Sequence, residues 1–399
     1  MDIRTDIHET VRTFTDFYRG HGHEPLPGES LLPPRGDDSV LFTTSGMHHL
    51  TPYLLGRPHP LGRRLSGVQR CLRTTDLEEV GDRSHLTVFE MLGTWSLGDY
   101  GSRQSLTWGH RLLCEGFGLR PGSLQVTVWG GDEQVGPDTE SLQTWQELGV
   151  PVELTREDNW WSNGPTGPCG PDTEIFVWTG PGEPVGTPTT DPGWVEVWNH
   201  VMMRYERLQD GRLVPLPQQS IDTGMGLERL LTILQGTGSV YETDVFRPWQ
   251  ESVPGLWRLG EQDHRVVVDH LRSSIVVIGD GVLPSSNGRG YVLRRLLRRV
   301  LTILWQLDGV LEDLPLDLYE HTLDHFGQLP GVDGGGTTPT EVRRVVLEEQ
   351  QRFRKTLERG RKLLSRWPQD RVLDEENLRF LHETHGLPRD LVEVLVRLP

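Results

Sequence analysis

Two short stretches of the sequence carry residue types that could bind a nucleotide. The first runs from Arg73 to Met91, and its later part alternates in the manner of a strand. If Arg73 ends one strand and its antiparallel neighbour carries His85, Phe89 and Met91, all four side chains lie near one cleft. A guanidinium and an imidazole could hold phosphate there, and the aromatic ring could stack on a base. Taken singly, a surface Arg, a loop His and a core Phe are the commoner explanations.

The second stretch, SIDTGMGLERLLTIL (220–234), places two glycines directly before a helix. Gly224 and Gly226 allow close approach of a ligand to the backbone, and Arg229 falls in the first helical turn. Asp222 is a candidate buried carboxylate for an ammonium group. A tight strand-to-helix turn without any ligand would explain the same two glycines.

The basic residues restrict which phosphate chemistry is available. Of 40 basic residues only Lys355 and Lys362 are lysines, so no lysine occurs in the first 354 positions. A P-loop, a protein kinase and a pyridoxal enzyme each need a lysine, and none can be built there. Arginine grips phosphate bidentately and stays charged, so a phosphate site in this chain must use arginine.

The overall charge and the cysteine content narrow the possible class of protein further. The formal net charge of −17 argues against non-specific coating of nucleic acid, although it allows a local basic stripe. Cys71, Cys114 and Cys169 have no metal-like spacing, so we expect reduced thiols, no zinc and a cytoplasmic location. The sequence has no apolar run near the roughly 18 residues of a membrane span, and its acidic start is unlike a leader peptide. We expect a soluble protein with no membrane partner.

The elements that must position these residues divide at about position 245. Residues 1–245 are predicted to be mainly strands, as in SVLFTT (39–44), SLQVTVWG (123–130), TEIFVW (173–178) and WVEVWNHVMMRY (194–205). Helical patterns are fewer here: residues 5–21, 104–118 and 140–149. An α+β fold with an antiparallel sheet flanked by helices is therefore expected, with this domain ending at residue 245.

Residues 246–399 are predicted to form a helical domain. In GYVLRRLLRRVLTILW (290–305) the apolar residues make one helix face and four arginines, Arg294, Arg295, Arg298 and Arg299, make another. Such a stripe is often a solvated face paired with acidic residues. GVDGGGTTPT (331–340) is predicted to be a flexible linker, followed by a long helix over residues 340–367.

Both stretches and the words around them resemble one family. The two stretches resemble motifs 2 and 3 of class II aminoacyl-tRNA synthetases. Together with further short motifs, in the same order along the chain, they are similar to alanyl-tRNA synthetases. The words are FTTSGM (42–47), QRCLR (69–73), FEMLGTWSLGDY (89–100), TGPCGPDTEIF (166–176), VEVWNHVMMRYER (195–207), SIDTGMGLER (220–229), DHLRSSI (269–275), GRGYVLRRLLRR (288–299) and LERGRKLL (357–364).

The resemblance implies a role for each matched residue. Arg73 would hold the ATP α-phosphate, His85 would lie near the γ-phosphate, and adenine would sit between Phe89 and Arg229, beside Gly226. Asp222 would pair with the substrate ammonium group. The residues implied to enclose the rest of a small amino acid are Met91, Trp161, Asn199, Val201 and Gly224. His200, on the opposite strand face, is predicted to pack in the sheet.

The reaction implied has two steps. The carboxylate of alanine, or of another small amino acid, attacks the α-phosphorus of ATP, and an acceptor then takes the acyl group. Mg²⁺ would bridge the phosphates. Glu174 is a guess for a magnesium ligand, and a paired structural carboxylate explains it equally well.

The chain departs from the family pattern at three places. The motif 2 loop after Arg73 is shortened and lacks the family's Gly-Gly-Lys-His stretch, so that lysine is deleted. The implied acceptor-stem readers are altered at Ser286 and Asn287, and at Glu383, where the family has Asp. The sequence stops at Pro399, before the editing and C-terminal domains, so we interpret it as a truncated paralogue.

Three hypotheses stay open from the sequence. In the first, a core alanine–tRNA ligase charges tRNA, and Arg294 and Arg298 belong to the acceptor-stem region. In the second, a paralogue passes the amino acid to a small molecule or a carrier protein in specialised biosynthesis. In the third, the fold serves a non-catalytic regulatory protein, although retention of Arg73, Asp222 and Arg229 argues against it.

Overall fold

A computed structural model describes residues 6–34, 40–162, 164–327, 337–366, 374–385, 387 and 389–397. Its contacts divide the chain into two compact units. The first holds the residues up to Gln250 together with residues 325–327, and the second holds residues 251–324 and the described residues from 337 onward. None of the described helices is long and apolar enough to cross a membrane.

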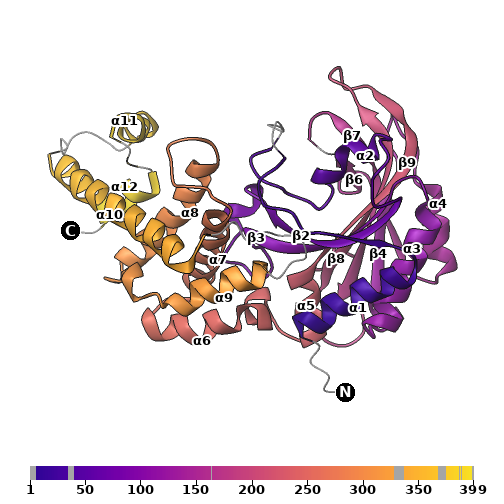
Figure 1. Ribbon diagram of the computed structural model, residues 1–399, viewed down its shortest axis with the longest axis horizontal. Helices are drawn as coiled ribbons and strands as arrows, with labels where there is room; N and C mark the ends of the chain where they lie inside the picture. Colours follow the sequence, from indigo (N-terminus) through magenta and orange to yellow (C-terminus); the bar gives the residue numbers. More distant parts are fainter. Residues whose placement is uncertain are drawn as a thin grey trace. The chain divides into compact units, whose positions relative to one another are not determined.

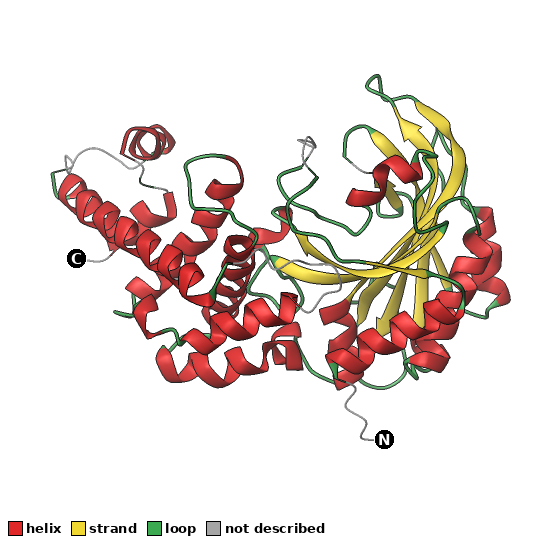
Figure 2. Ribbon diagram, in the orientation of Figure 1, coloured by secondary structure: helices red, strands yellow, loops and turns green. Residues whose placement is uncertain are grey.

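The first unit is built on a nine-stranded sheet, drawn in yellow in Figure 2. Its strand order is β1-β2-β3-β9-β8-β7-β4-β5, with β6 paired to β7. Neighbouring strands are antiparallel except for β1 with β2 and β4 with β5. The strands are β1 (Glu24–Leu26), β2 (Arg64–Leu72), β3 (Val88–Ser96), β4 (Leu124–Trp129), β5 (Val152–Thr155), β6 (Trp160–Ser162), β7 (Gly167–Trp178), β8 (Trp194–Arg207) and β9 (Leu213–Gly226).

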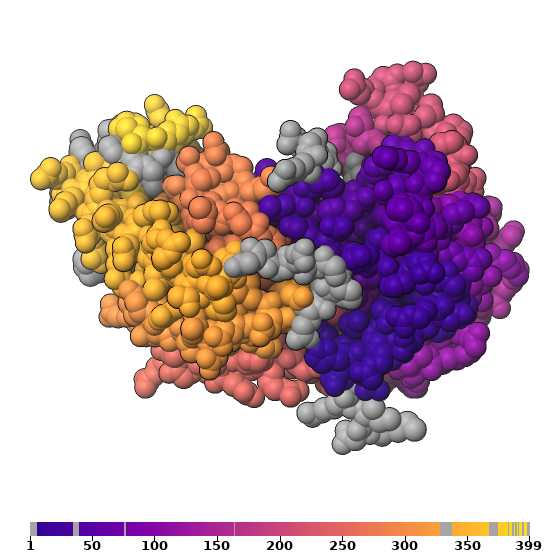
Figure 3. All heavy atoms as spheres, in the orientation of Figure 1, coloured from indigo at the N-terminus to yellow at the C-terminus, as the bar shows by residue number. Residues whose placement is uncertain are grey.

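Helices of this unit cover the sheet and follow its strands (Figure 1). They are α1 (Ile7–Gly20), α2 (Thr51–Leu54), α3 (Ser102–Arg111), α4 (Thr139–Glu147), α5 (Leu227–Gln235) and the start of α6 (Arg247–Leu256). A π-helical turn, Leu112–Gly116, extends α3. In the space-filling view the indigo N-terminal residues form much of the near face of this unit (Figure 3).

Alternation along β8 separates the two faces of the sheet. Trp198 is fully buried and lies against Phe14 and Tyr18 of α1, with ring centres 6.2 and 6.4 Å away. Val201 faces the other way and joins a core with Leu50 and other residues from η1 (His48–Leu50), α2, β2 and β9. Successive strand residues point to opposite faces. One face of β8 therefore packs against α1, and the other face can line a site.

The second unit is helical. Its elements are the rest of α6, α7 (Glu261–Gly279), α8 (Gly288–Trp305), α9 (Leu316–Gly327) up to Asp324, α10 (Pro339–Leu364), α11 (Glu375–His385) and α12 (Arg389–Arg397). The long α10 starts with a capping box, in which the Thr338 hydroxyl accepts from Glu341 N–H and the Glu341 carboxylate accepts from Thr338 N–H. The sheet followed by helices confirms the predicted α+β fold class.

Two local predictions were wrong. Residues 40–44 of SVLFTT form bends and coil, and Ser39 lies outside the described residues. The predicted linker 331–340 ends too late, because Thr338 caps α10 and the helix begins at Pro339. Residues 331–336 of that linker lie outside the described part of the chain.

Candidate active site

A cavity of about 530 Å³ opens on the face of the sheet where β3, β9, β8 and β7 run side by side. It lies entirely within the first unit. Its walls come from these strands, the loop between β2 and β3, β6, and the first turn of α5. Of the residues predicted for ATP and the amino acid, those lining it are Arg73, His85, Phe89, Met91, Trp161, Asn199, Val201, Asp222, Gly224, Gly226 and Arg229.

Arg73 is held beside an aromatic ring. It follows β2 directly, and its Nε donates to the carbonyl oxygen of Thr44 at 3.3 Å. Its guanidinium carbon lies 5.2 Å from the ring centre of Phe89 on β3. This distance is within the range of a cation–π contact, so the guanidinium is fixed at the cavity wall.

Arg229 enters the cavity from the first turn of α5. Its guanidinium donates to Oε2 of Glu196 at 2.8 Å, and both side chains are about one-third exposed. Gly226 precedes this helix, and a Cβ there would first meet Arg229 Cβ at 3.7 Å. Gly226 and Arg229 therefore lie next to each other at the cavity wall.

His85 lines the same cavity, but the strand predicted to carry it starts later. β3 begins at Val88, so His85 belongs to the loop between β2 and β3. Two carboxylates of that loop fix its imidazole: Asp82 Oδ2 lies 2.6 Å from Nδ1, and Glu79 Oε2 lies 3.1 Å from Nε2. Loop hydrogen bonds, and not strand alternation, orient this ring.

Asp222 is a buried carboxylate in the middle of the sheet. It accepts a hydrogen bond at Oδ1 from the indole N–H of Trp95 at 2.6 Å. Burial raises the pKa of Asp222 to about 7, against the opposing effect of that hydrogen bond. A cationic ligand would stabilise the ionised form of this carboxylate, because the buried negative charge would then be paired.

Gly224 keeps room beside Asp222. It lies opposite Gly93 of β3 and Asn199 of β8 in the sheet. A Cβ at Gly224 would lie 2.7 Å from the sulfur of Met91, which is too close for both side chains to stay in place. Gly224 and Met91 therefore form the cavity wall here, and the space that they leave suits a small ligand group.

Comparison with known proteins gives the family of this chain. The family model described as "tRNA synthetases class II (A)" matches residues 9–398. An alanine–tRNA ligase of Treponema pallidum is 39% identical over all of this chain and 69% of its own length. The chain belongs to the alanyl class II tRNA synthetase family.

Other relatives agree with this family. Alanine–tRNA ligases of Treponema denticola and Rubrobacter xylanophilus are 44% and 40% identical over 75% and 97% of this chain. The aligned regions cover 53% and 47% of those two proteins. The chain thus spans about half the length of most of the curated relatives it matches.

Two carboxylates of β7 also line the cavity of this family member: Glu174, the sequence-based guess for a magnesium ligand, and Asp172, which the sequence analysis did not single out. Burial, with the charges of Glu196 and Asp172 beside it, raises the pKa of Glu174 to about 9. Burial also raises the pKa of Asp172 to about 7, although amide hydrogen bonds from Asn159 and Asn199 oppose the shift. Asp172 and Glu174 are two residues apart on β7, so strand alternation was the available signal for the pair.

Glu228 is a further carboxylate that sequence reasoning missed. It is buried next to Arg229, and both of its oxygens accept from the backbone N–H of Glu90, at 3.2 and 3.1 Å. Glu90 lies between Phe89 and Met91 on β3. Glu228 therefore ties α5 to the strand that supplies two walls of the cavity.

His200 packs away from the cavity, as predicted. Its ring is fully buried, and Nδ1 lies 2.9 Å from the Ser105 hydroxyl of α3. Burial lowers the pKa of His200 to about 3, so the ring is neutral. It fills the space over Gly109, where an added Cβ would come within 2.9 Å of the ring.

The residues predicted for the acceptor are in the second unit of this family member. Ser286 and Asn287 are exposed just before α8, and Glu383 is exposed on α11. Arg294 donates to the Ser285 carbonyl at 3.3 Å, and Arg298 donates to the buried Glu349 at 3.0 Å. Arg298, one of the four arginines, is thus paired with a carboxylate of α10, which is the pairing that the sequence analysis gave as the common explanation of such a stripe.

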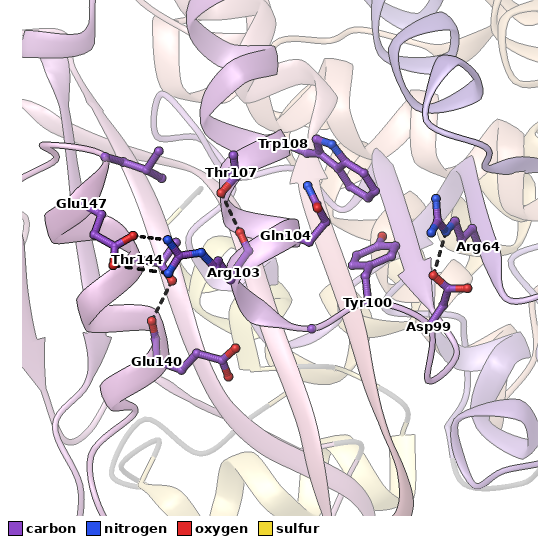
Figure 4. Close-up of a pocket in the computed structure, with 12 residues that line it drawn as sticks. Arg64, Asp99, Tyr100, Arg103, Gln104, Thr107, Trp108, Glu140, Thr144 and Glu147 are labelled. Carbon is purple, nitrogen blue, oxygen red and sulfur yellow. Dashed lines mark hydrogen bonds and ion pairs between the residues drawn. The ribbon is translucent and has the colours of Figure 1, made fainter.

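A second groove of about 720 Å³ lies over α3 and α4 of the first unit (Figure 4). Four of its charged groups form two pairs, Arg103 with Glu147 and Arg64 with Asp99 at 2.8 Å, and Glu140 lies 3.5 Å from Arg204 outside the groove. Arg64 also lies 5.8 Å from the ring centre of Tyr100. A groove whose charges are already neutralised by its own walls offers less to a charged substrate than the cavity on the sheet.

Proposed function

We propose that this chain activates alanine with ATP, giving alanyl-adenylate and pyrophosphate, and then passes the alanyl group to tRNA. One observation carries the proposal. A single cavity combines the guanidinium groups of Arg73 and Arg229 with the buried carboxylate of Asp222. A nucleotide phosphate and an amino-acid ammonium group need these two charges close together.

Nucleotide binding is assigned to the arginine side of the cavity. Arg73 offsets the charge that develops on the α-phosphate during attack, and Phe89 and Arg229 enclose the adenine ring. The imidazole of His85 lies near the γ-phosphate. The contacts of Arg73 with Thr44 and Phe89 support this role, because a guanidinium held before the reaction needs little rearrangement during it.

Amino-acid binding is assigned to the glycine side. Asp222 pairs with the α-ammonium group, and Asn199 lies beside it. The walls against the methyl group are Met91, Trp161, Val201 and Gly224. The carboxylate of alanine is then directed at the α-phosphorus, so catalysis comes from positioning and from charge stabilisation.

Magnesium is the ion we propose for this site, and no zinc is required by the proposed reaction. Mg²⁺ in nucleotide sites uses one or two carboxylates, with phosphate oxygens and water completing the shell. Among the described residues, no three His, Cys, Asp or Glu side chains are grouped to hold a metal on their own. Burial first, and then the charge of Glu196, raises the pKa of Glu174, and a divalent cation would oppose both effects. Glu196 and Glu174 would hold the ion, which would neutralise phosphate charge.

Alanine-dependent ATP–pyrophosphate exchange tests the activation step. We expect exchange with the unaltered protein and its loss in Arg73→Ala, with little change in melting temperature because Arg73 is at the cavity wall. No exchange with alanine, glycine or serine would overturn the proposal and favour the regulatory hypothesis.

The acceptor is the second step to be tested. tRNA is the acceptor that the family favours, with Ser286, Asn287 and Glu383 near its acceptor stem. Charging should depend on the G·U pair of the stem and fall as salt is raised. The bond between Arg298 and Glu349 favours the second candidate, a small-molecule or carrier acceptor, because it withdraws a cation from phosphate binding. Exchange without charging of any tRNA would support that candidate. Either reaction would take place in the cytoplasm.

A further inference from the structure

A row of buried polar side chains backs the amino-acid end of the cavity. Asn159 precedes β6, is fully buried, and donates from Nδ2 to Oδ1 of Asp172 at 2.9 Å. The other oxygen of Asp172 accepts from Nδ2 of Asn199 at 3.4 Å. The row thus reaches from the connection between β5 and β6 to β8, and the activation steps above do not use Asn159 or Asp172.

The hydrogen bonds at the far end of this row run in the same direction as the rest. The hydroxyl of Thr155 donates to Oδ1 of Asn159, which leaves only the amide nitrogen of Asn159 to face Asp172. The backbone N–H of Asp172 also donates to the carbonyl oxygen of Asn159 at 3.0 Å. Asn159 is therefore anchored at three points, and its amide cannot turn without breaking two side-chain bonds.

The same logic decides the orientation of Asn199. Nδ2 of Asn199 donates to Oδ2 of Asp172, which leaves the amide oxygen of Asn199 for another partner. That oxygen, Oδ1, is buried and has no hydrogen-bond partner among the described residues. A buried acceptor without a donor costs free energy, so a ligand that supplies an N–H or O–H group to this atom would be stabilised.

The sheet register places Asn199 near the proposed ammonium site. Asn199 lies opposite Gly224 on β9, and Asp222 lies opposite Val201, two residues further along β8. All four residues line the cavity. An ammonium group paired with Asp222 has further N–H groups to donate, and the strand geometry puts the Asn199 side chain on the same face to receive one.

We propose that Asp172 is a positioning residue that sets the polarity of the Asn199 amide, so that Asn199 Oδ1 accepts a hydrogen bond from the substrate ammonium group. This proposal rests on the proposed activation of alanine. It gives the site two acceptors for the ammonium group, one charged and one neutral. It also explains selection against a ligand that presents an oxygen acceptor at this point, because two acceptors would face each other.

Asp172→Asn is the first test, because it keeps the size of the side chain. The new amide can accept from Asn159 and donate to Oδ1 of Asn199, which turns the Asn199 amide so that its nitrogen faces the cavity. In ATP–pyrophosphate exchange we expect the KM for alanine to rise about tenfold or more, because a bond to a charged group is lost. The KM for ATP should stay within about twofold, since its site is at the arginine side.

A matched control separates this effect from general damage to the buried row. Asn159→Leu removes the other partner of Asp172 but leaves the bond between Asp172 and Asn199. We expect a lower melting temperature in this variant, with a KM for alanine within about threefold of the unaltered protein. A rise in KM as large as in D172N would mean that the row only supports packing, and would overturn the proposal.

The double variant D172N/N199D tests whether the KM for alanine can be restored. It exchanges the carboxylate and the amide, so the amide nitrogen donates across the pair and an oxygen again faces the ammonium group. We expect the KM for alanine to return to within about threefold of the unaltered protein, with N199D alone not recovering it. Should the single variant fail to fold, a KM more than about tenfold raised in the folded double variant contradicts the proposal. Absence of alanine-dependent exchange in the unaltered protein would instead count against the proposed function.

Discussion

Trp95 and Asp222 are cross-strand partners whose side chains meet below the cavity floor. The indole N–H of Trp95 donates to Oδ1 of Asp222 at 2.6 Å, across the pair of strands β3 and β9. The side chains are almost fully buried, with 1% and 7% of their residue surface exposed. The carboxylate is thus held by a neutral donor, and a cationic ligand would complete its environment.

The pH dependence of alanine use follows from this pair. Burial raises the pKa of Asp222 to about 7, so the group is neutral below that pH and ionised above it. Only the ionised form attracts an ammonium group. We expect kcat/KM for alanine in the exchange assay to fall about tenfold per pH unit below 7 and to level off above it. A profile that stays flat down to about pH 5 would contradict this prediction.

Trp95→Phe tests whether Asp222 is the group that titrates. The substitution removes the hydrogen bond that favours the ionised carboxylate, so the pKa of Asp222 should rise further. We expect the inflection of kcat/KM to move up by about one pH unit. Asp172 also has its pKa raised to about 7, but it makes no bond to Trp95, so an inflection that does not move would assign the titration to another group.

Gly224→Ala should reduce alanine binding by crowding. The added Cβ would lie 2.7 Å from the sulfur of Met91, so the Met91 side chain or the strand would have to shift. We expect the KM for alanine to rise about tenfold and the KM for ATP to change little. Adding Met91→Val should recover much of the loss, since the shorter side chain ends before the clash. An unchanged KM for alanine in the single variant would show that Gly224 does not limit the pocket.

Sequence patterns predicted the sheet, the main helices and the residues that gather at the cavity, because alternation and helical periodicity are local. They could not predict contacts that depend on strand register or helix packing. Glu196 lies 33 residues before Arg229, and Glu349 lies 51 residues after Arg298, yet each pair forms a hydrogen-bonded ion pair. His85 was placed on a strand because its loop continues the alternating pattern, while Asp82 holds the ring outside any strand.

Phe89 should matter more for ATP than for alanine. Its ring supports the guanidinium of Arg73 at 5.2 Å and forms one face of the proposed adenine site. We expect Phe89→Leu to raise the KM for ATP about three- to tenfold, because the leucine side chain has no π face for the cation or the base. Phe89→Tyr keeps the ring and should stay within about twofold. Equal effects of the two variants on the KM for ATP would contradict a stacking role.

We predict that Arg298 of α8 contributes to stability through its contact with Glu349. Glu349 is 1% exposed, and Arg298 donates to it at 3.0 Å. Arg298→Met leaves a buried carboxylate with weaker partners, since Arg294 and Arg352 lie 3.9 and 3.5 Å away. We expect the free energy of unfolding to fall by about 3 kcal/mol, measured by urea denaturation.

Arg295→Met is the matched control on the same helix. Arg295 is exposed, so its replacement should change the free energy of unfolding by less than about 0.5 kcal/mol. If tRNA is the acceptor, this variant should weaken tRNA binding and reduce its salt dependence, because one positive charge on the surface of this helix is lost. Stability losses of similar size in both variants would contradict a specific role for the pair of Arg298 and Glu349.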